Sequence, residues 1–100
     1  MKVREDETGY ELEVYGIYWI NGKRYHYVFS APLNYGLIVL NQDKCTLIDV
    51  SIDNFEIRCS GDGGDILIHK AASKDNLLDD VVEHMPEAVA EFKRRLVEYE

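Results

Sequence analysis

The sequence has few of the residues that mark enzymes and metalloproteins. Its 100 residues include two cysteines, two prolines and three histidines. No serine or cysteine stands in a recognisable nucleophile motif. His26, His69 and His84 are not spaced as a metal-binding pair on a helix, and neither cysteine lies near one of them in a zinc pattern. We therefore expect a non-enzymatic protein without a cofactor or a metal, whose histidines lie on the surface.

The sequence also lacks long apolar runs. No apolar segment follows the charged residues 2–7, so we expect no signal peptide. No stretch approaches the length that a bilayer span requires. Cys45 and Cys59 fall on opposite faces of the sheet predicted below, so we expect free thiols in a reducing, cytoplasmic environment.

Basic residues are scarce compared with acidic ones. Eleven Lys and Arg stand against nineteen Asp and Glu, for a net charge of −8. Residues 75–100 hold much of this excess, with three basic and eight acidic residues. This balance disfavours direct binding to nucleic acid or to an anionic membrane, and it favours a basic protein as the partner.

What the chain does contain is a series of strand patterns followed by helix patterns. They predict a single α+β domain over residues 1–100: a six-stranded antiparallel meander, as a curved sheet or a partly open barrel, followed by one or two C-terminal helices. Residues 1–8 carry charge without a period and are expected to be flexible. The meander spans residues 10–70 and the helical segment residues 75–100.

The first two strands form a hairpin around Asn21-Gly22, the strongest short hairpin signal in the chain. The predicted register pairs Tyr18 with Tyr25, and Gly16 marks a bend or bulge in the first strand. One face of this hairpin combines aromatic, apolar and basic side chains that are typical of interfaces. We expect these side chains to bind a partner or a second copy of the chain, unless another part of the protein covers them: Tyr15, Ile17, Trp19, Arg24 and His26.

Residues 45–70 are predicted to form three strands joined by tight turns at Asp53-Asn54 and Asp62-Gly63. In this register Val50 faces Ile57, and Ile57 faces Ile68. One face of the three strands is then almost purely apolar. A shift of one residue would move every apolar side chain to the opposite face.

The helical segment carries two apolar stripes. The first predicted helix spans residues 76–84, and Pro86 separates it from a second helix that ends near Tyr99. Carboxylates along these helices could occupy a cleft built for phosphates on a basic target; the alternative is a solvated helix face with local pairs such as Glu91 with Arg95. The candidate partner-binding carboxylates are Asp75, Asp79, Asp80, Glu83, Glu87 and Glu91.

The glycine-rich residues 60–65 resemble a phosphate or Ca²⁺ loop only weakly, and a hairpin turn explains them better. Taken together, size, charge and missing motifs favour a small acidic inhibitor of the toxin-immunity or phage anti-defence (anti-CRISPR) type. Such a protein would block a basic or nucleic-acid-binding surface of its target. The alternative is a small-ligand module in which the curved sheet encloses a pocket lined by Tyr18, Tyr25, Tyr27 and Phe29.

Overall fold

The computed structural model describes residues 1–29, 36–60, 64–73 and 77–99. In this part of the chain, an antiparallel sheet of seven strands precedes three helices. The elements are β1 (Lys2–Glu5), β2 (Glu11–Ile20), β3 (Lys23–Phe29), β4 (Leu37–Asn41), the 3₁₀ helix η1 (Gln42–Lys44), β5 (Cys45–Asp49), β6 (Phe55–Ser60), β7 (Gly64–His69), α1 (Lys70–Ser73), α2 (Leu77–Val82) and α3 (Pro86–Val97).

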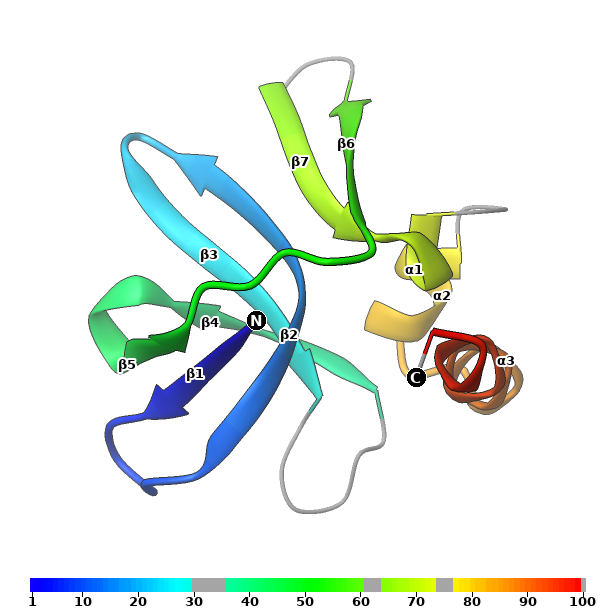
Figure 1. Cartoon of the computed structure of the whole chain (residues 1–100), viewed down its shortest axis with the longest axis horizontal. Helices are drawn as coiled ribbons and strands as arrows, with labels where there is room; N and C mark the ends of the chain where they lie inside the picture. The colour runs from blue at the N-terminus through cyan, green and yellow to red at the C-terminus, as the bar shows by residue number, and fades with distance from the viewer. Residues whose placement is uncertain (30–35, 61–63, 74–76, 100) are drawn as a thin grey trace.

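The predicted α+β class is confirmed, and the sheet is not closed. Its strands follow the order β4-β3-β2-β1-β5, while β7 pairs with β2 and β6 pairs with β7. Figure 1 shows the three helices on one side of the sheet, with β1 and β5 on the other side of β2. The structure has one strand more than the six predicted. The additional strand is β1, which forms within residues 1–8, where the sequence predicted a flexible terminus. Its Val3 is fully buried, so this segment is part of the core.

The first hairpin forms as predicted. Asn21 and Gly22 adopt the positive φ angles of 51° and 80° that a tight turn requires. Tyr18 pairs with Tyr25, and the register shifts between Val14 and Gly16, which confirms the predicted bulge. A Cβ at Gly16 would lie 2.9 Å from Cδ2 of Tyr27, so glycine lets this ring pack closely on β2.

The bulge divides β2 into two halves with different neighbours on one edge. β1 pairs with the N-terminal half, where Val3 lies opposite Leu12. β7 pairs with the C-terminal half, where Ile68 lies opposite Gly16. Because the bulge adds one residue to β2, Val14 and Ile17 both enter the same core cluster.

The predicted pairing of residues 45–52 with residues 55–60 is wrong. The Asp53-Asn54 turn does form, with Asn54 at φ 64° and a hydrogen bond from the amide of Phe55 to the carbonyl of Ile52. However, β5 pairs with β1, and β6 pairs only with β7 among the described residues. The turn therefore redirects the chain from one side of the sheet to the other (Figure 1).

The predicted register of the next hairpin is wrong by one residue. Ile57 lies opposite Leu67, whereas the sequence predicted Ile68. The predicted Asp62-Gly63 turn lies outside the described residues. The predicted apolar layer does not form either: Val50 is 70% exposed and Ile57 is 71% exposed.

Two core clusters lie on opposite faces of the sheet. The first lies between the sheet and the helices, and Phe92 at its centre is fully buried. The second lies where β1 and β5 curl over the other face; it contains Val3, Leu12, Val14, Ile17, Val28, Leu40 and Cys45. A curved sheet with both faces packed is thus assembled from strands that have apolar side chains on both sides.

The helical segment follows its prediction closely. α2 presents Leu78 and Val81 to the core, and Pro86 occupies the first turn of α3, where its missing N–H costs nothing. His84 ends the α2 segment at φ 59°, and Met85 precedes α3 in an extended conformation. The predicted break near Met85 is therefore confirmed.

Candidate functional site

The hairpin face predicted to bind a partner is mostly buried. Ile17 is 3% exposed and His26 is fully buried. Tyr15 packs edge-on against Phe92, with ring centroids 5.1 Å apart. Only Trp19, which is 48% exposed, keeps a large apolar surface in contact with solvent. The alternative, that other parts of the protein cover this face, therefore describes Tyr15, Ile17 and His26: the bulge turns Ile17 into the core, and α3 covers Tyr15.

Arg24 and His26, the two basic members of that predicted patch, form a structural hydrogen-bond chain. Arg24 Nε donates to Nε2 of His26 at 2.8 Å, and Nδ1 of His26 lies 3.1 Å from the carbonyl oxygen of Leu40. This pattern fixes a neutral imidazole with its proton on Nδ1. Burial also lowers the pKa of His26 below its usual value, which favours the neutral ring.

The thiol of Cys45 lies 3.8 Å from Nδ1 of His26. A Cys-His pair of this kind invites comparison with a nucleophile and its base. Here Nδ1 carries the proton that it donates to Leu40, and burial raises the pKa of the Cys45 thiol. The thiol therefore stays protonated at neutral pH, and Cys45 is part of the second core cluster.

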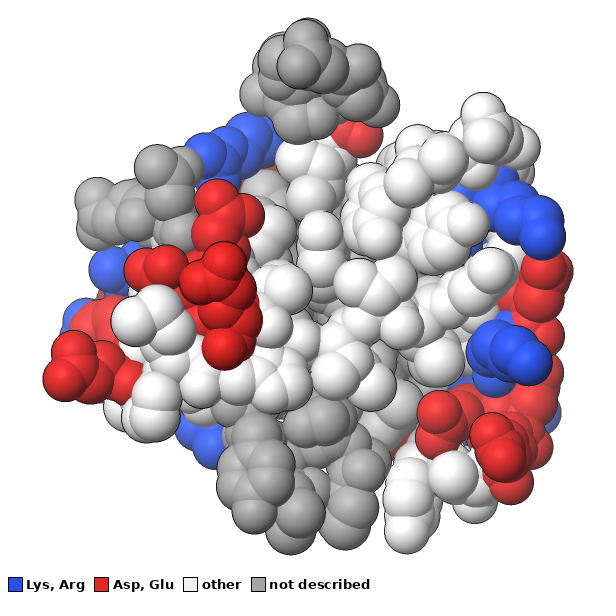
Figure 2. Space-filling view, turned by 180° about the vertical axis from the view of Figure 1, so that it is seen from behind, with Lys and Arg blue, Asp and Glu red and all other residues white. Residues whose placement is uncertain are grey.

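The acidic helices present most of their predicted carboxylates to solvent. Asp79, Asp80, Glu83 and Glu87 are exposed, and none has an ion-pair partner among the described residues. Viewed from behind, acidic side chains gather on the helical side of the molecule and also on the opposite side (Figure 2). Asp75 lies outside the described residues.

Glu91 differs from the other predicted carboxylates because it is already paired. It accepts hydrogen bonds from Arg94, one of them 2.8 Å from Nε, and Arg95 Nε lies 3.4 Å from the same carboxylate. The hydrogen bond from Arg94 holds the pKa of Glu91 below its usual value. For this residue the local-pair alternative describes the structure.

Three half-buried tyrosines form a stacked group on β2 and β3, here called the tyrosine ladder: Tyr18, Tyr25 and Tyr27. The ring of Tyr18 lies 5.2 Å from that of Tyr25 and 5.3 Å from that of Tyr27. Burial raises the pKa of Tyr27, and the negative charge of Asp79 adds to this rise, which places α2 near the ladder. Asp79 of α2 is therefore close enough to Tyr27 for its charge to act on the ring hydroxyl.

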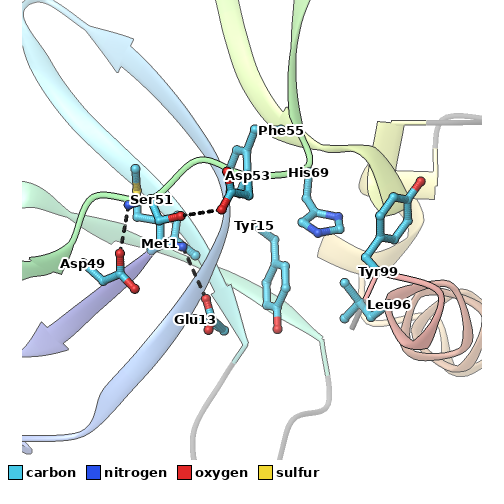
Figure 3. Close-up of a pocket in the computed structure, with 11 residues that line it drawn as sticks. Met1, Glu13, Tyr15, Asp49, Ser51, Asp53, Phe55, His69, Leu96 and Tyr99 are labelled. Atoms are coloured by element: carbon cyan, nitrogen blue, oxygen red, sulfur yellow. Dashed lines mark hydrogen bonds and ion pairs between the residues drawn. The ribbon is translucent and has the colours of Figure 1, made fainter.

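The rings that were expected to line an aromatic pocket lie against other side chains in the described residues. The rings of the tyrosine ladder stack on one another, and Phe29 packs against Phe92 with centroids 5.5 Å apart. Instead, a different cavity of about 350 Å³ opens between the sheet, the segment after β5 and the end of α3. Figure 3 shows this cavity, here called the His69 pocket, whose lining residues are Met1, Glu13, Val14, Tyr15, Asp49, Ser51, Asp53, Phe55, His69, Leu96 and Tyr99.

One side of the His69 pocket is acidic. The N-terminal ammonium of Met1 lies 3.6 Å from the carboxylate of Glu13. Asp49 accepts a hydrogen bond from the amide of Ser51 at 2.9 Å, and the Ser51 hydroxyl donates to Asp53 at 3.1 Å. Within the described ranges, no three His, Cys, Asp or Glu side chains converge as a metal site.

The other side of the pocket is aromatic and centres on His69. The sequence predicted a surface histidine, but His69 is only 8% exposed. Its Nδ1 accepts a hydrogen bond from the amide of Ala71 at 3.0 Å, and its ring meets those of Tyr15, Phe55 and Tyr99 edge-on. Burial lowers the pKa of His69, so the imidazole is neutral at pH 7.

The glycine-rich loop lies mainly in residues 61–63, outside the described residues. In the part of the chain that the structure describes, no helix has the length and apolar character needed to cross a bilayer. The chain matches no protein-family model, and comparisons with curated proteins and with solved structures find no significant match. The candidate functional sites in the described residues are therefore the tyrosine ladder with the α2 carboxylates, and the His69 pocket.

Proposed function

We propose that the protein binds a basic partner protein through the surface formed by the tyrosine ladder and the carboxylates of α2. The observation that carries this proposal is the proximity of Asp79 to Tyr27, because carboxylates and aromatic rings both recognise Lys and Arg. Asp79, Asp80 and Glu83 offer carboxylates that are exposed and unpaired among the described residues. The adjoining tyrosine rings offer π faces, which attract cations. Charge-assisted hydrogen bonds and cation–π contacts would then act on the same partner side chains.

Under this proposal the protein is a non-enzymatic, cytoplasmic inhibitor of the toxin-immunity or anti-CRISPR type. Its carboxylates would occupy a basic surface that otherwise binds phosphates, and so block nucleic-acid binding by the target. The net charge of −8 would steer the encounter and exclude nucleic acid itself. Ile20 and Val39 are apolar residues on β2 and β4 that are 51% and 43% exposed, and they would add contact area beside the ladder.

The first experiment uses nona-arginine as a stand-in for a basic surface, with amide NMR as the readout. We expect shifts at the tyrosine ladder and α2 that weaken as NaCl rises from about 50 to about 200 mM. A variant with Asp79→Asn, Asp80→Asn and Glu83→Gln should lose most of this response. Shifts spread evenly over all acidic surfaces would contradict the proposal.

The matched control removes the same number of charges elsewhere. Glu7→Gln, Glu11→Gln and Glu56→Gln change three exposed carboxylates outside the proposed surface. This control should keep the localised response, because it retains the α2 carboxylates. If both triple variants weaken binding equally, net charge alone explains the interaction. Affinity capture from host lysate with the same three proteins then identifies targets lost only by the α2 variant.

A further inference from the structure

His69 places a hydrogen-bond donor in the cavity without a polar acceptor. Because Nδ1 accepts from the Ala71 amide, the neutral ring carries its proton on Nε2. No hydrogen bond joins Nε2 to any described residue, although His69 is only 8% exposed. Figure 3 shows the ring extending into the space between Tyr15 and Tyr99. A buried donor of this kind is costly unless it meets an acceptor, and ring faces are only weak acceptors.

The acidic side of the same cavity holds one cation, the Met1 ammonium, for three carboxylates. Glu13 has the Met1 ammonium, but Asp49 and Asp53 have no ion-pair partner among the described residues. They hold hydrogen bonds from Ser51 that fix their positions beside the cavity. A ligand that fits this site therefore needs a positive group for the carboxylates and an acceptor oxygen for His69.

We infer that the His69 pocket binds a lysine- or arginine-type cation that also carries a carbonyl oxygen. The ammonium or guanidinium group would face Asp49 and Asp53, and the carbonyl would accept from Nε2 of His69. The ring of Tyr15 would contact the alkyl chain between these two groups. The cavity of about 350 Å³ falls at the lower end of the range for small-molecule pockets. This inference is independent of the binding surface at α2.

Three probes separate the two ligand features. Nα-acetyl-L-lysinamide has both the cation and the carbonyl, Nα-acetyl-L-norleucinamide lacks only the cation, and pentylamine lacks the carbonyl groups. In amide NMR titrations, we expect the lysinamide to shift Tyr15, His69 and Tyr99. We expect each of the other two probes to bind at least about tenfold more weakly, as the loss of a charged hydrogen bond or a buried acceptor implies. Equal affinity for the lysinamide and the norleucinamide, or the absence of localised shifts, would overturn the inference.

Variants test the residues. Asp49→Asn with Asp53→Asn should weaken lysinamide binding about tenfold or more, whereas the charge-matched pair Glu11→Gln with Glu56→Gln should not. His69 is buried and its replacement can unfold the protein, so its role is read from the imidazole nitrogen resonances of the unmodified chain. They should report an Nε2–H tautomer whose proton shifts downfield when the lysinamide binds. An unchanged Nε2 proton in the bound state would overturn the role of His69.

The ligand could be a free compound or a side chain of another protein. The peptide Ala-Ala-Lys-Ala-Ala distinguishes these sources because it presents the same groups within a backbone. Tighter binding of the peptide than of the lysinamide assigns the pocket to a residue of a partner chain. Equal or weaker binding of the peptide assigns it to a small amine.

Discussion

The exposure of Ile57 gives the sharpest test of the strand pairing. The sequence pattern predicted this side chain in the core, opposite Val50 and Ile68. In the structure it lies opposite Leu67 and is 71% exposed, whereas Ile17 on β2 is 3% exposed. The same substitution, Ile→Thr, can be made at both positions, and it keeps a β-branched residue in each strand.

The expected costs follow from the exposed fractions. The substitution replaces about two apolar groups, and burial of each is worth roughly 0.8 kcal/mol. At Ile17 this loss is nearly complete, and a hydroxyl without a partner adds about 1–3 kcal/mol. We therefore expect Ile17→Thr to lower the free energy of unfolding by roughly 3–4 kcal/mol. At Ile57 less than a third of the apolar term applies and the hydroxyl reaches water, so the expected cost is about 0.5 kcal/mol.

Urea unfolding followed by circular dichroism measures both costs under one condition. Equal slopes of free energy against urea concentration would show that the substitutions leave the unfolded state comparable. If Ile57→Thr costs as much as Ile17→Thr, then Ile57 is a core residue and the strand pairing described here is incorrect.

Other predictions concern the bulge, the buried histidines and the thiol. Gly16→Ala should lower the free energy of unfolding in urea by about 1–3 kcal/mol, because its Cβ would force the ring of Tyr27 to move; unchanged stability would contradict this packing. His26 and His69 have lowered pKa values when folded, so the unfolded chain binds more protons as the pH falls below about 6.5. Urea unfolding should therefore show that the free energy of unfolding falls as the pH is lowered from about 7.5 to about 5.5. A free energy that stays constant or rises as the pH is lowered would be inconsistent with neutral buried rings. Cys45 is buried and its thiol pKa is raised, so a thiol reagent should label it much faster in urea than in buffer. Mass spectrometry identifies the labelled residue, and equally fast labelling in buffer would place the thiol at the surface.

The parts of the fold that the sequence predicted correctly are those determined by neighbouring residues. Asn21-Gly22 is a local signal for a tight turn, and the β2–β3 register follows from it. Pro86 and the apolar stripe with Phe92 similarly determine the start and the buried face of α3. In these segments the residues that specify the element lie within the element itself.

The errors arise where the chain pairs over long distances. Asp53-Asn54 does form a turn, but the segments on either side of it do not pair with each other. β5 pairs instead with β1, which comes from the N-terminal end of the chain. The bulge at β2 changes which side chains face the core, and its consequence for Ile17 depends on strands that come later in sequence. No local pattern contains this information.

The candidate sites show the same division. Exposure of Asp79, Asp80 and Glu83 follows from the helical period, so the acidic face could be predicted. The His69 pocket could not, because residues from β2, the segment after β5, the end of β7 and α3 meet only in the folded chain.

Cross-strand proton contacts measured by NMR test the central claim most directly, since both proposed surfaces depend on the strand pairing. We expect backbone contacts from Val3 to Leu47 and from Ile57 to Leu67. Backbone contacts from Ile57 to Val50 would contradict the account, because they would join β6 to the segment after β5 and dismantle the His69 pocket.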